Sequence, residues 1–242
     1  MLPIKKYTLG IRPSQKLFRL SSLMGMVIDA VLSCRGEKDI DEEYYSEVSR
    51  NVESSVLLLR NEERGNILRI DMENVIFTKD LYETDRHFDI DKTIQEFRLI
   101  WKFTNDVLKL SNIRRVGMVA EYRIGPTSGS PSKILIEAFT KITSSSHPGK
   151  FQLRYENRSL VNSGSAPNLQ KDDYLNVIYD FYDSEMDVSH PQQDHINANL
   201  DVQRYYSPLL NGNVFDEINK LKKEFQRQKT NFASDLTAKG LL

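Results

Sequence analysis

Apolar residues recur along this chain with two different spacings, and each spacing predicts one type of element. From Leu17 to Val31 they lie three or four positions apart, which lines one face of a helix that ends near Gly36. Comparable stripes predict helices over 91–108, 131–142 and 213–236. Side-chain oxygens just before a first turn favour helix initiation, so the expected N-caps are Asp91, Ser130 and Asn213.

Alternation of apolar and polar residues predicts strands with one buried and one wet face. It runs over 115–124, 151–156 and 196–203, and less cleanly over 175–181, where Ile178 is also apolar. The segment 7–11 is expected to be a short strand that stops at Pro13. Two further apolar runs, 56–59 and 67–72, flank a segment rich in Asn and Gly and predict a β-hairpin, with 75–77 as a possible continuation.

The order of these elements is β-α-β-β-α-β followed by α-β-β-β-α. The first six match the split-βαβ plan of ferredoxin-like folds. We therefore predict an α+β chain with antiparallel sheet, a ferredoxin-like start and a long C-terminal helix. We expect a single domain over 1–242, with a division into halves 1–124 and 125–242 as the alternative. This architecture hosts many functions and identifies none of them.

Composition narrows the class of protein. The chain has 242 residues, 39% of them hydrophobic and 28% charged, which is enough to bury a core. A formal net charge of -1 argues against a polycation that coats nucleic acid. The one cysteine, Cys34, excludes an intrachain disulfide and a cysteine-rich zinc site, and it is expected to be a buried thiol. We expect a cytoplasmic protein without a membrane-spanning segment.

Familiar catalytic signatures are absent from the sequence. It contains no Walker A loop, GxGxxG, GxSxG elbow, HExxH or Glu-x-Lys pair. The loop Gly125–Ser130 precedes a helix and could offer N–H groups to an anion, but such loops are common without ligands. His190, Asp194 and His195 could hold zinc or manganese, with a plain surface turn as the alternative. We expect no cofactor, and we lean towards a protein without enzymatic activity.

The C-terminal helix offers the most extended candidate surface. Its apolar seam, long enough to serve a partner helix, consists of Phe215, Ile218, Leu221, Phe225 and Phe232. The leading hypothesis is a protein-interaction module that binds a partner or self-associates through this seam. The alternative for the same residues is packing of the helix on its own sheet.

Nucleic-acid binding is a second hypothesis. The opposite face of that helix carries Lys220, Lys222, Lys223, Arg227 and Lys229. The N-terminal region adds Lys5, Lys6, Arg12, Lys16 and Arg19. Cations on one surface contact phosphates, and sheet aromatics such as Tyr155, Tyr179 and Tyr182 could stack unpaired bases. A metal-dependent hydrolase built on His190, Asp194 and His195 is the third hypothesis.

Two stretches resemble a sporadically distributed prokaryotic family of uncharacterised proteins of similar length. One is Arg114–Ile124, which resembles the family's Arg–hydrophobic–Gly strand, although Tyr122 stands where the family usually has Asn. The other is Leu200-Asp201-Val202, followed by the helix that contains Phe225. The family has no established activity to carry over. Its patchy distribution implies an accessory role in a defence or toxin–antitoxin system.

Overall fold

The computed structural model describes residues 2–34, 36, 40–82, 88–125, 127, 129–142, 148–183 and 195–242. Within these ranges, nine strands form one antiparallel sheet in the order β2-β3-β4-β5-β1-β6-β9-β8-β7. The strands are β1 (Ile4–Pro13), β2 (Glu47–Asn51), β3 (Val56–Asn61), β4 (Asn66–Ile70), β5 (Val75–Asp80), β6 (Ile113–Ile124), β7 (Gln152–Leu160), β8 (Tyr174–Asp183) and β9 (Ile196–Leu210). The helices are α1 (Leu20–Leu32), α2 (Ile90–Leu108), α3 (Pro131–Phe139) and α4 (Val214–Ala238). The prediction of an α+β fold with antiparallel sheet and a long C-terminal helix is confirmed.

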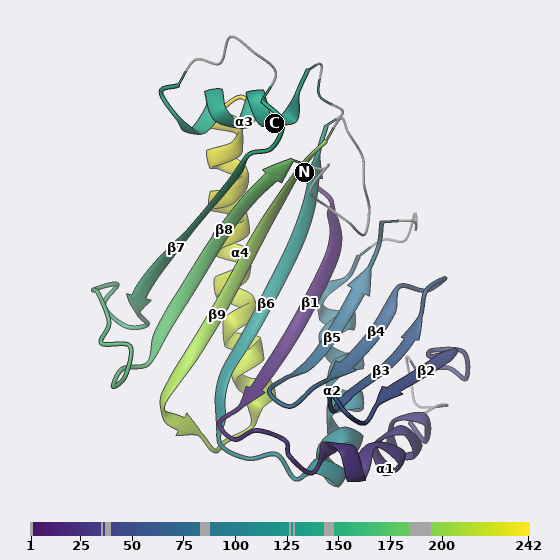
Figure 1. The fold of residues 1–242 in the computed structure, drawn as a ribbon. Coiled ribbons are helices and arrows are strands. Elements are labelled where there is room, and N and C mark those ends of the chain that lie inside the picture. The colour runs from purple at the N-terminus through teal and green to yellow at the C-terminus, as the bar shows by residue number, and fades with distance from the viewer. Residues whose placement is uncertain are drawn as a thin grey trace.

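The two longest helices lie on the same side of the sheet. Figure 1 shows α4 running behind β6, β9 and β8, and α2 behind the smaller strands β3 to β5. Helix α1 packs against α2 at the lower corner, and α3 sits at the end of β8. The face of the sheet turned towards the viewer therefore carries no helix among the described residues.

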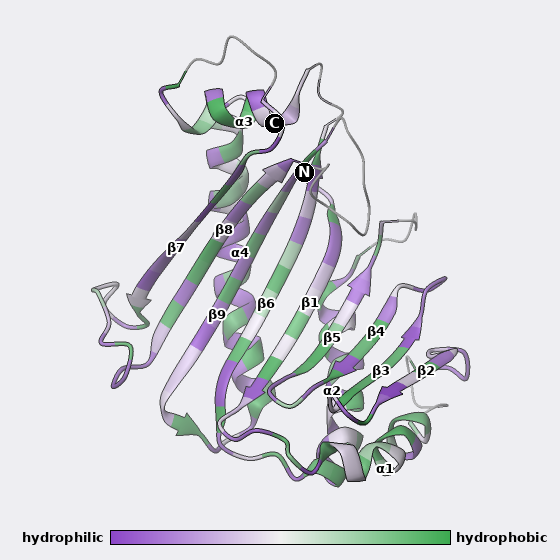
Figure 2. Ribbon diagram, viewed as in Figure 1, coloured by the Kyte–Doolittle hydropathy of each residue, from purple (hydrophilic) through white to green (hydrophobic). Residues whose placement is uncertain are grey.

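Alternation along the strands builds the core between the sheet and these helices. In β6, Val116, Met118, Ala120 and Tyr122 are buried, and the residues between them are only partly buried. In β9, Leu200 and Val202 face the same side. Figure 2 shows the resulting bands of apolar and polar residues across the sheet.

Strand β6 joins the early and late parts of the chain. It pairs with β1 on one side and with β9 on the other, so residues from both parts contribute to one continuous sheet. Met118 of β6 lies opposite Leu9 on one side and opposite Val202 on the other. The centre of the sheet thus depends on contacts between distant parts of the sequence.

The ferredoxin-like start is not found. Four strands, β2 to β5, lie between α1 and α2, where the β-α-β-β-α-β plan has two. The segment 75–77 forms a separate strand, β5, and β2 was not predicted at all. All five residues of β2 are exposed, because it is an edge strand that buries neither face. It therefore lacks the alternation that marks a strand in sequence.

The helix ends differ in detail from the prediction. Helix α1 begins at Leu20 and ends at Leu32, so Leu17 and Gly36 lie outside it. The N-cap of α2 is Asp89, whose carboxylate accepts from the backbone N–H of Asp91 and Lys92. The expected caps of α3 and α4, Ser130 and Asn213, are confirmed. None of the described helices has the length and hydropathy needed to cross a membrane.

Candidate functional site on the open face of the sheet

The apolar seam of α4 is used inside the molecule. Phe215, Ile218, Leu221, Phe225 and Phe232 are each at most 3% exposed. Phe225 packs edge-on against Tyr7 of β1, and Phe232 packs against Tyr122, Tyr179 and Phe181 of the sheet. These five side chains face the chain's own core, so a partner in contact with this fold would have to use other residues.

Most cations of α4 already have a carboxylate beside them. Lys220 pairs with Glu217, Lys222 with Asp91 and Arg227 with Glu224, at N···O distances of 2.6, 2.6 and 2.5 Å. Lys223 is exposed and Lys229 is half-buried. The five cations therefore do not form the unpaired basic stripe that phosphate contact favours.

Two of the aromatic candidates for base stacking, Tyr155 and Tyr179, already pack against other rings of the protein. Tyr155 stacks on Tyr179 at 4.9 Å between ring centroids, and Tyr179 lies between it and Phe232 of α4. The Tyr179 hydroxyl donates to Gln228 of the same helix at 3.1 Å. Tyr155 and Tyr179 thus serve packing under α4, whereas Tyr182 alternates to the other side of β8.

Side chains of the protein itself accept hydrogen bonds from the backbone N–H groups at the start of α3. Asp183 of β8 accepts from the backbone N–H of Ser132 at 3.1 Å and from its hydroxyl at 2.7 Å. The hydroxyl of Ser130 caps the N–H of Lys133. An internal carboxylate therefore takes the position that an external anion would need. Pro126 and Ser128 of the loop before α3 lie outside the described residues.

Two of the three residues of the proposed metal site lie outside the described residues. His190 and Asp194 lie outside the described residues, and His195 directly precedes β9. Among the residues that are described, no group of three His, Cys, Asp or Glu side chains is close enough to hold an ion. Cys34 is fully buried, and its thiol donates to the carbonyl of Val31, as expected for a structural thiol.

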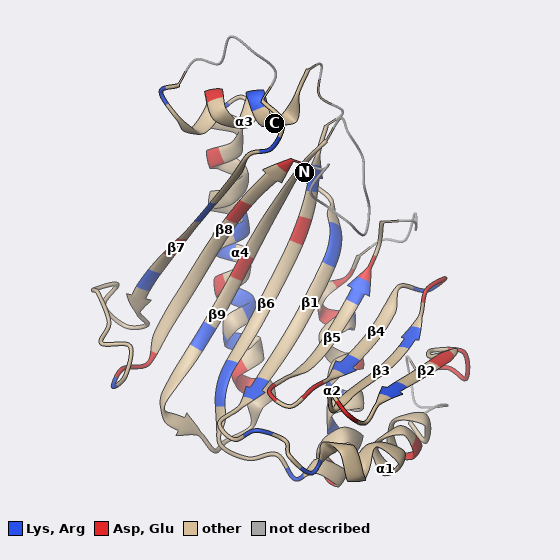
Figure 3. Cartoon of the chain, in the orientation of Figure 1, with Lys and Arg blue, Asp and Glu red and all other residues tan. Residues whose placement is uncertain are grey.

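The uncovered side of the sheet presents a continuous polar surface, which we call the open face. It is made by outward-facing residues of β1 and β6 to β9 that alternate with the buried core residues. They include Lys6, Thr8, Gly10, Arg12, Arg115, Gly117, Glu121, Arg154, Glu156, Asn176, Asp180, Asn199, Asp201, Gln203 and Tyr205. Figure 3 shows charges of both signs interspersed on the strands of this side.

Several cations of the open face lie beside acids, whereas Arg115 donates only to the neutral side chains of Gln203, Tyr205 and Asn74. Lys6 lies 3.4 Å from Glu121, and Arg12 lies 2.5 Å from Glu73. On the outer strands, Arg154 pairs with Asp180 at 3.4 Å and Arg158 with Glu156 at 2.7 Å. The surface therefore combines many charges with little net field, which does not favour a polyanion.

A hydrogen-bonded chain of side chains runs along β9 on the open face. The Gln203 amide donates to Asp201 Oδ2 at 2.6 Å, and its oxygen accepts from the Tyr205 hydroxyl at 3.0 Å. Arg115 of β6 donates to the Tyr205 hydroxyl at 3.2 Å. These contacts fix the orientation of three successive outward residues of β9.

Asp201 lies at one end of this chain. Its direct neighbours across the sheet are Ile178 and Val119, so its carboxylate lies between two aliphatic side chains. Desolvation raises the pKa of Asp201 to about 6, and the hydrogen bond from Gln203 only partly opposes this effect. The group therefore changes charge just below neutral pH.

Three acceptor oxygens on the open face have no donor. They are the side-chain Oδ1 atoms of Asn176, Asn199 and Asp201, all buried and without a hydrogen bond to any described residue. A buried acceptor without a donor costs about 1–3 kcal/mol. These three oxygens therefore lower the stability of the sheet and lie below its accessible surface.

A patch without side chains lies beside these acceptors. Gly10 of β1 faces Gly117 of β6 in the ladder. A Cβ atom built on Gly10 would meet nothing within 4 Å, and one on Gly117 would lie 3.5 Å from Gln203 Cγ. The two glycines leave backbone accessible in the centre of the sheet.

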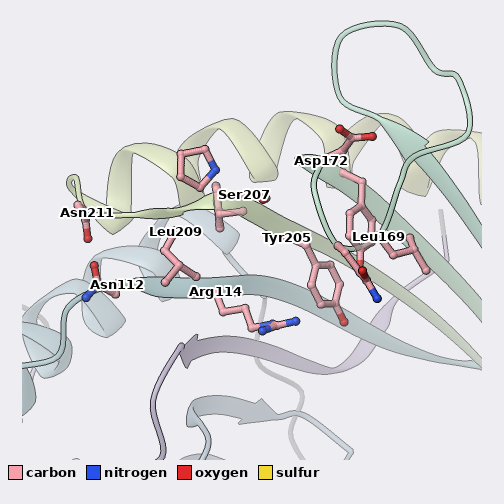
Figure 4. A pocket seen from close by; sticks show the side chains of 12 residues that line it. Asn112, Arg114, Leu169, Asp172, Tyr205, Ser207, Leu209 and Asn211 are labelled. Carbon is pink, nitrogen blue, oxygen red and sulfur yellow. The ribbon is translucent and has the colours of Figure 1, made fainter.

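A cavity of about 600 Å³ adjoins the lower end of the open face, between the start of β6, the end of β9 and the segment before β8. An irregularity in the β6–β9 ladder between Ile113 and Arg115 interrupts the alternation there. Figure 4 shows Arg114 extending towards Tyr205, with Leu169 and Asp172 on the other side. The rings of Tyr174 and Tyr205 stack at 4.6 Å.

Sequence reasoning missed this surface for an identifiable reason. The alternation predicts only that Asn197, Asn199, Asp201 and Gln203 lie on the wet side of a strand. Their polarity gave no hint of burial, yet Asn197 is 0% exposed. The unusual run of amides in that alternation is the signal that could have identified it.

Comparisons with known proteins give no assignment. No protein-family model matches the chain, and no curated protein matches it either.

Proposed function

We propose that the chain is a non-enzymatic protein-interaction module that binds a protein partner on the open face of its sheet. The single observation that carries this proposal is the broad face of β1 and β6 to β9, which carries charges of both signs and which no described helix covers. Its polar groups are complementary to a protein surface that has mixed charges and hydrogen-bonding groups of its own.

The arrangement of these groups supports binding over catalysis. Asn199 and Asp201 lie two residues apart on the same face of β9, and Asn176 lies on β8 one step further along. The acceptors are thus spread along the strands and do not converge on one point, whereas catalysis needs several groups around one reacting atom. Polar groups spread over a broad face suit an extended interface.

Charge pairing supports a protein over a nucleic acid as the partner. The open-face cations Lys6, Arg154 and Arg158 each lie beside a carboxylate. A phosphate backbone would have to displace those carboxylates, whereas a protein surface with mixed charges would not. An accessory role in a prokaryotic defence or toxin–antitoxin system remains the expectation that the resemblance implies.

A matched pair of glycine substitutions tests the proposal. Gly10→Leu places a bulky side chain in the centre of the open face, where the space is empty, and Gly25→Leu makes the same change on exposed α1, where the space is also empty. The tagged wild type and both variants are used to capture proteins from a prokaryotic lysate, with quantitative mass spectrometry as the readout. We expect a protein that wild type and Gly25→Leu retain and that Gly10→Leu loses at least tenfold.

Two controls define the outcome. Denaturation midpoints must agree between the variants, so that loss of binding reflects the surface and not the fold. Light scattering of the pure protein shows whether the partner is a second copy, in which case Gly10→Leu shifts a dimer to a monomer. Identical captured sets for all three proteins, or recovery of nuclease-sensitive nucleic acid in place of protein, would contradict the proposal.

A further inference from the structure

A separate cavity lies on the helix-covered side of the molecule, against the second half of α4. Its volume is about 510 Å³, and its lining includes Leu2, Tyr122, Lys229, Phe232 and Ala233. This volume falls within the range of small-molecule sites. It shares no lining residue with the cavity beside the open face.

The inner wall of this cavity is apolar. Leu2, Tyr122 and Phe232 are at most 9% exposed, and the rings of Tyr122 and Phe232 pack at 5.6 Å. Ala233 contributes only a methyl group from α4, which leaves space beside the helix. A hydrocarbon chain placed here would remove apolar surface from water.

Two polar groups at the cavity have no partner. Lys229 is half-buried, and its ammonium forms no ion pair or hydrogen bond with any described residue. The Tyr122 hydroxyl is buried and forms no hydrogen bond within the described parts of the chain. Burial raises the pKa of Tyr122, so its hydroxyl keeps its proton, and burial lowers the pKa of Lys229, since no nearby charge offsets the desolvation of the ammonium.

No acidic residue is among the described residues that line the cavity. Besides Lys229, its polar lining includes Gln226, Thr230, Ser234 and Thr237, and the three hydroxyls donate to carbonyls of α4. We propose that it binds an alkyl carboxylate, with the chain against Leu2 and Phe232 and the carboxylate at Lys229. The carboxylate supplies the counter-ion that Lys229 lacks. This site is independent of the open face and of the proposed protein partner.

Decanoate is the probe, titrated calorimetrically into the full chain below its micelle concentration. Decyltrimethylammonium, with the same chain length and the opposite charge, is the headgroup control. We expect saturable 1:1 binding of decanoate that is at least tenfold tighter than binding of the cation. Lys229→Gln should weaken decanoate binding about fivefold to tenfold and remove the headgroup preference.

Further variants separate the site from non-specific binding. Lys223→Gln removes an exposed charge of the same helix outside the cavity and should leave decanoate binding unchanged. Ala233→Leu fills the cavity and should abolish it. The proposal is overturned if the wild type shows no saturable decanoate binding, if Lys229→Gln binds decanoate as the wild type does, or if Ala233→Leu retains full affinity.

Discussion

Burial destabilises the charged form of Asp201, and no nearby group fully compensates for the lost hydration. Its pKa is raised to about 6, so ionisation costs more in the folded state than in the unfolded chain. Between about pH 4 and pH 6 the folded state holds a proton that the unfolded state has lost. Stability therefore falls as pH rises through this window and stays reduced above it.

Asp201→Asn should remove this penalty while keeping the acceptor for Gln203. At pH 7.5 we expect the variant to be more stable than wild type, by at most about 3 kcal/mol for a shift of about two pKa units. At pH 4 the two proteins should have nearly equal stability. Urea denaturation at both pH values measures the difference. A variant that is less stable than wild type at pH 7.5 would show that Asp201 is stabilised in its charged form.

A buried ion pair anchors α2 to β5. Lys79 Nζ lies 2.6 Å from Glu96 Oε2, and Tyr44 donates to the same oxygen at 2.7 Å. Glu96 is only 4% exposed. Removing one partner leaves a buried charge, which costs about 3–5 kcal/mol.

Lys79→Met is therefore expected to reduce the free energy of unfolding by about 3–5 kcal/mol. The double variant Lys79→Met, Glu96→Leu should recover part of the loss, because both charges are then absent. A double-mutant cycle from denaturant titrations gives the coupling energy. Simple additivity of the two single effects would contradict a coupled pair.

At the scale of elements, the spacing of apolar residues predicted most of the helices and strands, because those elements bury one face. Stripes such as Phe215 to Phe232 and the alternation of Val116 to Tyr122 coincide with buried residues. The exposed edge strand β2 has no such stripe and was missed. From the sequence, the apolar seam of α4 could cover either its own sheet or a partner, because both uses require the same spacing of apolar residues. The structure shows that the sheet covers it.

Phe225→Ala distinguishes these two uses of the seam. Phe225 is 1% exposed and packs on Tyr7, so its truncation should reduce the free energy of unfolding by about 3–5 kcal/mol. We expect no change in oligomeric state for the fraction that remains folded. Light scattering together with thermal denaturation measures both quantities. A change in assembly at unchanged monomer stability would assign the seam to a partner instead.

For the whole molecule, the open face and its cavity could not be predicted, because they arise from strands that are distant in sequence. Gly10 and Gly117 are 107 positions apart and meet only through the β1–β6 ladder. Burial raises the pKa of Asp201, and its direct neighbours in the sheet, Ile178 and Val119, come from two other strands. The sequence shows the polarity of such residues, but their burial and neighbours follow from strand order.

The same strand order makes a prediction about cooperativity. Trp101, the only tryptophan, is 7% exposed on α2 and reports on the segment 1–124. Leu200 of β9 belongs to 125–242 and is fully buried, so Leu200→Ala should reduce stability by about 2–5 kcal/mol. Because β6 pairs with β1 and β9 alike, we expect the loss to appear in Trp101 fluorescence and circular dichroism at the same denaturant concentration. If the Trp101 transition stayed in place while circular dichroism showed a second, earlier step, the halves 1–124 and 125–242 would be separate folding units.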